Sequence, residues 1–282
     1  MDVRYLDHQA VLSILPDRPL ESHKGDYGRL LLLCGSRGYT GAAALAAMGA
    51  LRSGAGLVYL GVPESIYAIE AGKLTEPIVF PLPDLDGKLA EESVAQILPM
   101  LEKMDAVLIG PGLGQSSGTE QVLLSVLKEA LCPIVVDADG INLLSAHKDI
   151  LRGRKQCTVL TPHEGEFQRL TGHITQDRIA AAQAVAADLG VILVLKGHNT
   201  VITDGGLCYI NPTGNPGMAV GGSGDVLAGI IVSLLGQGLS PISAASCAVW
   251  LHGRAGDIVA ERIGQYGMLP SDMLEVLPRL MK

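Results

Sequence analysis

The chain has 282 residues and a formal net charge of −8, which argues against a nucleic-acid partner because such binding needs clustered Lys and Arg. Hydrophobic residues make up 48% of the sequence and aromatic residues 4%, so we expect a core of Leu, Val, Ile and Ala. No stretch rich in Pro, Ser or charge divides the sequence, and we expect a single domain over residues 1–282.

The five cysteines are spread along the chain without a C-x-x-C pair. This argues against disulfides and zinc, and favours a reducing, cytoplasmic location. The first 19 residues carry several charged side chains and lack the long apolar core of a signal peptide. Alanine-rich stretches are interrupted by Gly and charge too often for membrane spans, so we expect no membrane partner.

Short apolar runs alternate with helical patterns from residue 30 onward. The predicted strands are Leu30–Cys34, Leu57–Val62, Ala106–Ile109, Ile134–Val136, Thr158–Leu160 and Val191–Leu195. The predicted helices include Gly41–Arg52, Thr119–Ala130 and Arg178–Leu189, and the pattern is helical again from Gly222. This alternation is typical of right-handed βαβ units, so the sequence predicts an α/β fold with a mainly parallel sheet and helices on both faces.

Two further apolar runs, Val201–Thr203 and Leu207–Ile210, flank the turn residues 204–206, which are Asp, Gly and Gly. Such a pattern is typical of an antiparallel β-hairpin. We expect this hairpin to lie at an edge of the sheet.

Loops rich in Gly or polar residues follow several of the predicted strands. Ligands of open α/β sheets bind beyond the carboxyl ends of the strands, so these loops are the candidate ligand-binding segments. They are Gly35–Gly41, Gly110–Gln115, Asp137–Asn142, Thr161–Glu166 and Lys196–Thr200.

The run Gly221-Gly222-Ser223-Gly224 precedes an apolar helix that carries Asp225 in its first turn. The free N–H groups and the dipole at a helix start favour an anion, and glycines let a phosphate approach the main chain. Capping of the helix by Ser223 or Asp225 is the simpler interpretation, but it needs only one such residue. A carboxylate beside an anion hole can take the proton of a hydroxyl that attacks phosphorus, so we expect Asp225 to be a catalytic base.

The stretch from Thr161 to Glu166 follows one predicted strand and precedes a helix. Thr161 is suited to the N-cap, Pro162 to the first helical position and Glu164 to a capping box. This interpretation leaves His163 and Glu166 free at the ligand-binding edge, where His163 could contact a substrate. Glu166 could help to organise Mg²⁺, through water.

Three other loops have features that point to ligands. Three glycines in Gly110–Gln115 exceed what a tight turn needs and suggest close approach by a ligand. Asp137 and Asp139 are either metal-related or turn and capping residues, and the sequence favours neither. Lys196 starts a connection between two strands, where it is well placed for a phosphate.

The motifs resemble those of a known superfamily. Gly222-Ser223-Gly224-Asp225 resembles the anion hole of ribokinase-like small-molecule kinases, and Thr161–Glu166 matches their Thr-Pro-Asn-x-x-Glu motif with His163 in place of Asn. The similarity to ADP-dependent NAD(P)H-hydrate dehydratases, which are carbohydrate-kinase-like repair enzymes, is closer and covers nearly the whole chain. The matching stretches are Ser22–Gly25, Gly110–Gly114, Asp137–Asp139, Thr161–Glu166, Lys196–Gly197, and Asn215–Ala219 running into Gly221–Asp225.

This resemblance implies a ribokinase-like three-layer α/β/α fold and a hydro-lyase. The enzyme would restore NADH or NADPH from the S-form of its hydrate while ADP becomes AMP and phosphate. Asp225 would be the catalytic base. The implied substrate contacts are Ala42, Gly112, Gly114, His163 and Asp225. The implied nucleotide contacts are Lys196, Gly197, His198, Asn199, Thr200, Gly222, Ser223 and Gly224. The resemblance also implies Mg²⁺, a homo-oligomer, often a tetramer, and a separate NAD(P)H-hydrate epimerase as functional partner.

Two alternatives remain open at this point. A kinase for a vitamin-precursor alcohol would keep the phosphate loops and the base, although His163 and Asn215–Ala219 match the dehydratases. A nucleotide sensor without catalytic activity would also keep the loops, but the intact Asp225 beside intact glycines argues against it.

Overall fold

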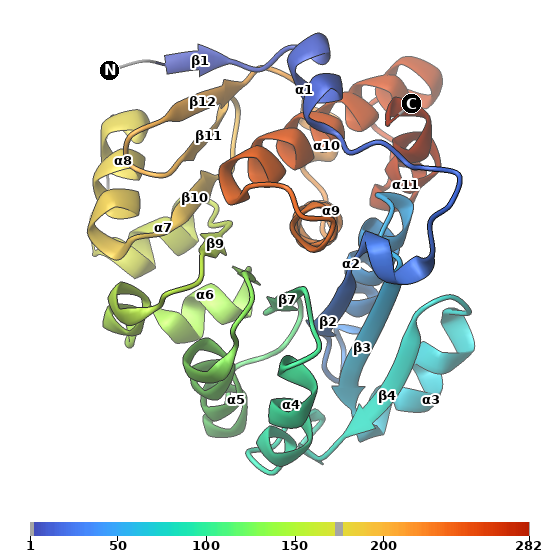
Figure 1. Ribbon diagram of the computed structural model, residues 1–282, viewed down its shortest axis with the longest axis vertical. Coiled ribbons are helices and arrows are strands. Elements are labelled where there is room, and N and C mark those ends of the chain that lie inside the picture. The colour runs from blue at the N-terminus through green and yellow to red at the C-terminus, as the bar shows by residue number, and fades with distance from the viewer. Residues whose placement is uncertain (1–2, 173–176, 282) are drawn as a thin grey trace.

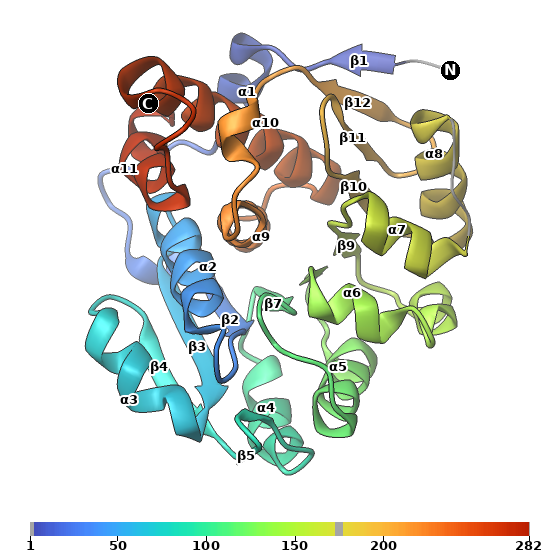
Figure 2. The same ribbon diagram turned by 180° about the vertical axis from the view of Figure 1, so that it is seen from behind.

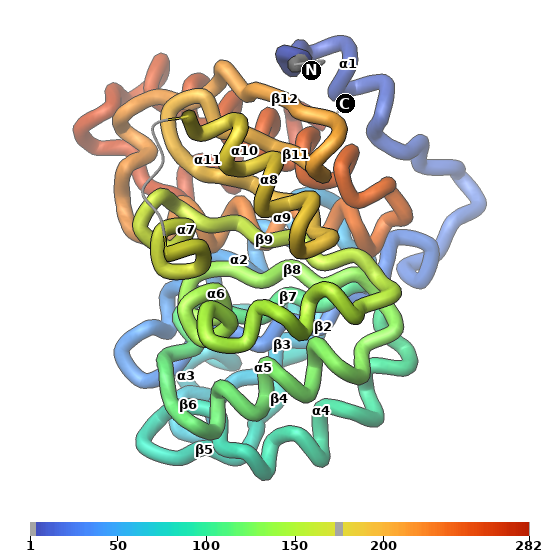
Figure 3. Tube along the Cα trace, turned by 90° about the vertical axis from the view of Figure 1, so that its left-hand side faces the viewer, coloured from blue at the N-terminus to red at the C-terminus, as the bar shows by residue number. Residues whose placement is uncertain are grey.

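The computed structural model describes residues 3–172 and 177–281 (Figure 1). Within them, ten strands form one sheet in the order β1-β12-β11-β10-β9-β8-β7-β2-β3-β4. Figure 3 shows the part from β9 to β4 side by side. Their bounds are β1 (Val3–Tyr5), β2 (Arg29–Leu33), β3 (Leu57–Pro63), β4 (Ile78–Leu82), β7 (Ala106–Ile109), β8 (Ile134–Val136), β9 (Thr158–Leu160), β10 (Ile192–Leu195), β11 (Thr200–Thr203) and β12 (Cys208–Asn211). A separate short pair is formed by β5 (Asp84–Leu85) and β6 (Lys88–Leu89).

The strands from β10 to β4 are parallel, and β11 is antiparallel to both of its neighbours. The predicted parallel sheet and hairpin are therefore confirmed. The prediction that the hairpin lies at the sheet edge is wrong, because β1 pairs in parallel with β12 and covers it. A three-residue edge strand carries too weak an apolar pattern to be recognised in the sequence.

Helices cover both faces of the sheet, because alternate side chains of a strand point to opposite sides. In β2, Leu30 and Leu32 belong to one core cluster, and Leu31 and Leu33 to the other. On the first face lie α1 (His8–Ile14), α2 (Thr40–Arg52), α3 (Glu64–Lys73), α9 (Ser223–Gly236), α10 (Pro241–Ile263) and α11 (Pro270–Leu280). On the second lie α4 (Ser93–Leu101), α5 (Ser117–Glu129), α6 (Asp139–Leu144), α7 (Glu164–Thr171) and α8 (Arg178–Leu189). The sheet curves around α9, which is seen end-on near the centre of Figure 1. The three-layer α/β/α prediction is confirmed.

Short 3₁₀ helices occupy three of the connections. They are η1 (Lys24–Tyr27), η2 (Lys148–Gly153) and η3 (Pro216–Met218). In the part of the chain that the structure describes, no helix combines the length and the apolar character needed to cross a bilayer.

Helices α2 and α9 pack backbone against backbone on the first face of the sheet, and Figures 1 and 2 both show them side by side. A Cβ atom at Gly229 of α9 would collide with the carbonyl oxygen of Ala46 in α2. A Cβ at Gly49 of α2 would lie 2.7 Å from the carbonyl oxygen of Val226. The glycines thus allow a closer approach than larger side chains permit, and small residues on both helices are a requirement of this contact.

Candidate active site

The loops that follow the parallel strands are hydrogen-bonded to one another at the carboxyl edge of the sheet. The N–H of Gly35, after β2, donates to the carbonyl of Pro111, after β7, at 2.8 Å. The N–H of Lys196, after β10, donates to the carbonyl of Pro162, after β9, also at 2.8 Å. Loops that the sequence analysis selected as candidate ligand-binding segments are therefore in contact at this edge of the sheet.

The start of α9 has the geometry of an anion-binding helix terminus. Gly222 is the N-cap, with a φ of +100°, and a Cβ there would lie 2.5 Å from the Leu45 side chain, so only glycine suits this position. No side chain caps the helix, and Ser223 Oγ instead donates to the carbonyl of Met218 at 2.8 Å. Capping by Ser223 or Asp225, the simpler interpretation of this motif, is therefore wrong. The N–H groups of Gly224 and Asp225 find no acceptor within the described residues and can bind an anion.

A buried ion pair lies in front of this helix start. Nζ of Lys196 is 2.9 Å from Oδ1 of Asp137, which also accepts a hydrogen bond from Thr161 Oγ1 at 2.7 Å. A Cβ atom at Gly224 would lie 3.3 Å from the same Nζ. The structure therefore brings together Lys196 and Gly224, two of the nucleotide contacts that the family resemblance implies, and shows that Asp137 holds the lysine. Their contact with a nucleotide stays a prediction.

Charge in this region is concentrated on one lysine and several carboxylates. Burial lowers the pKa of Lys196, but the charges of Asp137, Glu166 and Asp225 outweigh it, so its pKa lies above the ordinary value and the ammonium stays protonated. Nζ of Lys196 is 3.9 Å from Oε2 of Glu166. A permanent cation in front of unpaired N–H groups suits a phosphate.

Asp225 has the properties of a base near neutral pH. Its pKa is raised from 3.8 to about 7, mostly by burial and then by the charge of Asp137; Lys196 opposes this rise, and Asp139 adds a smaller contribution to it. Cys34, at the end of β2, is buried beside this group, and its pKa is raised by burial and by the charges of Asp225 and Asp137. A carboxylate with a pKa close to the working pH is well suited to general-base catalysis.

A second group of predicted residues lies at the start of α2. A Cβ built at Gly112 would lie 2.8 Å from the Cβ of Ala42, so these two predicted substrate contacts are neighbours. Ser36 Oγ donates to the carbonyl of Gly112 at 2.7 Å and ties the two loops together. A Cβ at Gly114 would instead face the Lys88 side chain at 3.0 Å.

The start of α7 differs from the prediction. The helix begins at Glu164, and His163 is its N-cap: Nδ1 of His163 accepts the N–H of Glu166 at 3.1 Å, and the Glu166 carboxylate accepts the N–H of His163 at 2.8 Å. The prediction that Thr161 caps the helix with Glu164 completing the box is wrong, because the Thr161 hydroxyl is used by Asp137. His163 and Glu166 are accordingly not free, although the His163 side chain remains 54% exposed.

The remaining carboxylates of the site are occupied by protein donors. Oδ2 of Asp139 accepts the N–H of Gly114 at 2.9 Å, and Oδ1 accepts from Gln115 Nε2 at 3.1 Å. Residues 3–172 and 177–281 contain no group of three or more His, Cys, Asp or Glu arranged to hold a metal ion. A contact of Glu166 to Mg²⁺ through water stays a prediction.

The family is established by comparison with known proteins. The family model described as NAD(P)H-hydrate dehydratase matches residues 30–279. The ADP-dependent (S)-NAD(P)H-hydrate dehydratase of Bacillus subtilis is 36% identical over 288 aligned residues, which cover 100% of this chain and 99% of that protein. This chain belongs to the NAD(P)H-hydrate dehydratase family.

Other family members are longer than this chain. The bifunctional NAD(P)H-hydrate repair enzyme of Moorella thermoacetica is 45% identical over 96% of this chain and 52% of its own length. The chain thus spans about half the length of the bifunctional relatives it matches.

Solved structures agree with this assignment. A crystal structure of the ADP/ATP-dependent NAD(P)H-hydrate dehydratase of Bacillus subtilis, co-crystallized with ATP/Mg²⁺, has a TM-score of 0.85 and 36% identity, covering 99% of this chain and 98% of that one. A ribokinase-like superfamily protein of Enterococcus faecalis has a TM-score of 0.86 and 33% identity, covering 99% and 95%. A hydroxyethylthiazole kinase of Pyrococcus horikoshii, at 17% identity, shares the fold alone.

One buried residue beside the candidate active site was not predicted from the sequence. His252 lies in α10, and burial lowers its pKa to about 4, so the imidazole is neutral. Its Nε2 atom has no hydrogen-bond partner among the described residues, while the backbone of Ser223 and the charge of Lys196 both influence the ring. A histidine inside a long apolar helix gives no sequence signal for such a position.

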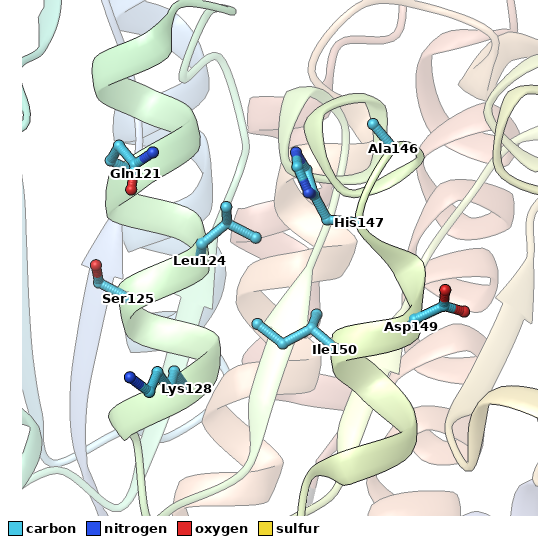
Figure 4. Close-up of a pocket in the computed structure, with 8 residues that line it drawn as sticks. All are labelled: Gln121, Leu124, Ser125, Lys128, Ala146, His147, Asp149 and Ile150. Carbon is cyan, nitrogen blue, oxygen red and sulfur yellow. The ribbon is translucent and has the colours of Figure 1, made fainter.

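A surface pocket lies away from these residues. It is formed between α5 and residues 146–150, which lead into and begin η2, and Figure 4 shows Leu124 of α5 pointing towards His147 and Ile150. His147 in its wall contacts Glu120 of α5. None of the predicted site residues lines this pocket, so the pocket is distinct from the candidate active site.

Proposed function

We propose that this chain is an ADP-dependent (S)-NAD(P)H-hydrate dehydratase, acting as a single domain. It would restore NADH or NADPH from the S-form of the hydrate while ADP becomes AMP and phosphate. The proposal is supported by family membership over residues 30–279 and by the match to the Bacillus subtilis enzyme along nearly the whole length of both chains. The observation that carries it is Asp225, a carboxylate with a pKa of about 7 beside unpaired N–H groups and Lys196.

The chemistry follows from the poor leaving ability of a hydroxyl group. Asp225 takes the proton of the ring hydroxyl as that oxygen bonds to the terminal phosphorus of ADP, and the bond from phosphorus to AMP breaks. Phosphate then leaves with the electron pair of the carbon–oxygen bond, and the adjacent ring carbon loses a proton. The ring double bond forms again, and the atoms of the added water leave as part of phosphate and as a proton.

The proposed contacts divide between two sides of Asp225. On one side, Lys196–Thr200 and Gly222–Gly224 would bind ADP. On the other, Ala42, Gly112, Gly114 and His163 would contact the hydrated dinucleotide, together with Asp225 itself. This division is supported by the contact of Ala42 with Gly112 and by the position of Lys196 next to Gly224. Mg²⁺ would enter as the complex with ADP, because Mg²⁺ is commonly bound through substrate phosphates.

A coupled assay tests the proposal. Hydrated NADH is incubated with ADP or with ATP and Mg²⁺, and the return of NADH absorbance is followed together with AMP and phosphate. We expect NADH, AMP and phosphate in equal amounts when ADP is supplied. Restoration of NADH without consumption of nucleotide would contradict the mechanism, and accumulation of a stable phosphorylated product would favour a kinase.

Three further parts of the proposal concern the setting of the enzyme. We expect a homo-oligomer, a tetramer in the family, and a separate epimerase that supplies the S-form of the hydrate. The bifunctional relatives carry the name repair enzyme, which supports a link between two repair activities. Five free cysteines support a reducing, cytoplasmic location.

A further inference from the structure

Arg178, the first residue of α8, is hydrogen-bonded to the connection between β10 and β11. Its Nη1 donates to the carbonyl of His198 at 2.7 Å. Its Nη2 donates to the carbonyls of Leu195 and Lys196 at 3.2 and 3.1 Å. One guanidinium therefore holds three carbonyl groups of a four-residue stretch, which fixes the path of that stretch.

The residues of the loop between β10 and β11 are suited to its contact with Arg178. A Cβ at Gly197 would lie 2.7 Å from Nη2 of Arg178, so a side chain there would displace the guanidinium. Gly197 also has a φ of +149°, which residues with a Cβ rarely adopt. Asn199 has a φ of +54°, in the left-handed region that Asn tolerates better than most residues. The unusual backbone of the loop and the arginine therefore depend on each other.

The arginine leaves the opposite groups of the loop available. While the carbonyls point to the guanidinium, the N–H groups of Gly197, His198 and Asn199 have no acceptor within the described residues. Consecutive N–H groups of this kind bind anions and ligand oxygens when their orientation is fixed. These N–H groups belong to the same loop as Lys196, whose ammonium lies in front of Gly224.

Stabilisation of α8 does not account for Arg178. The side chain of Asp177 already caps this helix by accepting the N–H groups of Ile179 and Ala180. A positive charge in the first turn is unfavourable to the helix dipole. The hydrogen bonds that the Arg178 side chain donates go to the loop between β10 and β11.

Arg178 also connects the two sides of the site. Its Nε is 3.2 Å from Oε1 of Glu164, the residue that follows His163 at the start of α7. The N–H of Lys196 donates to the carbonyl of Pro162 in the same segment. The guanidinium thus lies between the segment proposed to contact the dinucleotide and the loop proposed to contact ADP.

We propose that Arg178 is a positioning residue that orients the loop from Lys196 to Thr200, so that its N–H groups face a nucleoside diphosphate. This proposal rests on the proposed function for the identity of the nucleotide. It assigns no contact between Arg178 and the reacting atoms, because the guanidinium acts through the carbonyls of the loop.

Calorimetry with ADP and steady-state kinetics test the consequence for binding. Arg178→Ala should weaken ADP binding about tenfold or more and raise the KM for ADP, with kcat at saturating ADP changed much less. Arg178→Lys should recover binding only in part, since an ammonium cannot hold three carbonyls in a plane. Arg152→Ala is the matched control, because Arg152 bonds the Asp188 carbonyl at the other end of α8. Its ADP affinity should stay within about twofold of the wild-type value.

Amide NMR spectra recorded without nucleotide test the loop itself. In Arg178→Lys, and in Arg178→Ala if it folds, the resonances of residues 195–200 should shift or broaden while those of β2 and β7 stay unchanged. Unperturbed loop resonances would overturn the proposal even if the wild-type protein did not bind ADP at all. Wild-type ADP affinity in a folded Arg178→Ala protein would overturn it as well. Failure of the wild-type protein to bind ADP, with a perturbed loop in the variants, would contradict the proposed function and leave the orienting role of Arg178 supported.

Discussion

Nζ of Lys196 lies 2.9 Å from Oδ1 of Asp137, and this pair shares its surroundings with Asp225. Burial is the largest cause of the raised pKa of Asp225; Asp137 raises this pKa as well, whereas Lys196 lowers it. The strength of the proposed base therefore depends on its burial and on two residues that are 59 positions apart in the chain.

The first prediction concerns the pH dependence of the reaction. Asp225 must be ionised to accept a proton, so kcat/KM should fall as the pH drops below about 7. Asp137→Asn removes a negative charge beside Asp225, and the acidic limb of the pH profile should move to lower pH. Asp105→Asn is the control, since Asp105 accepts the N–H of Arg29, the first residue of β2, at the opposite edge of the sheet. A limb that does not move in Asp137→Asn would show that this charge does not act on the base.

Asp225→Asn provides the second prediction. The amide cannot take the hydroxyl proton, so kcat should fall about 10²–10⁴-fold. ADP binding should survive, because the N–H groups of Gly224 and residue 225 and the ammonium of Lys196 remain. Turnover measured with hydrated NADH, together with calorimetry for ADP, checks both statements. Near-normal turnover would remove Asp225 from the mechanism.

The same variant gives a third prediction, on stability. The folded-state pKa of Asp225 lies above its ordinary value of 3.8, so the native state is penalised once this carboxyl ionises. The penalty is absent below pH 4, grows as the pH rises and is complete above about pH 7. Asp225→Asn should therefore melt at a higher temperature than the wild type at pH 8, and the difference should shrink towards pH 4. Equal melting temperatures at both pH values would mean that the raised pKa is not a property of the folded protein.

Gly224→Val is the fourth prediction. The added side chain would start 3.3 Å from Nζ of Lys196 and would cover the N–H groups at the start of α9. ADP binding should weaken at least about tenfold, since both the anion site and its cation are disturbed. Gly72→Ala is a suitable control, because a Cβ at Gly72 meets no atom within 4 Å. Unchanged ADP affinity in a well-folded Gly224→Val protein would refute this placement of the nucleotide.

His163 provides the fifth prediction, in which two variants separate two roles. His163→Ala should lose the helix cap, at about 0.5–2 kcal/mol, and should also raise the KM for the hydrated dinucleotide. His163→Asn should keep the cap, because Asn is a favoured N-cap residue, and should still raise that KM. Kinetics and chemical denaturation of both proteins check the prediction. If His163→Asn has a wild-type KM, the histidine is a helix cap and not a substrate contact.

The sequence predicted most of the sheet because its strands are buried on both faces. Ala106–Ile109, Ile134–Val136 and Thr158–Leu160 agree with the structure to the residue, since their apolar runs are bounded by polar or glycine-rich loops. The edge strands β1 and β4 were not predicted. In β4, Ile78 is 44% exposed and Pro81 interrupts the pattern, so the sequence lacks the continuous apolar signal of the central strands.

The site was predicted as a set of loops but not as a set of contacts. The glycine run before Asp225 and the loop that starts at Lys196 could be recognised from the sequence, because their glycines indicate an unusual backbone conformation. Thr161 was wrongly expected to cap α7, because its hydroxyl bonds the distant Asp137 instead. Partners that meet only in the folded chain, such as Asp137 with Lys196 and Arg178 with the β10–β11 loop, leave no periodic or motif signal.

The backbone contact between α2 and α9 sets a limit on how the proposed site can adapt to its ligands. Ala42 lies in the first turn of α2 and Asp225 in the first turn of α9, and the glycines at the crossing leave no clearance for one helix to slide along the other. The distance between Ala42 and Asp225 is therefore fixed by the packing of the two helices. Asp225 would therefore meet its ligands from a fixed position, and the loop Lys196–Thr200 beside it is held in place by Arg178.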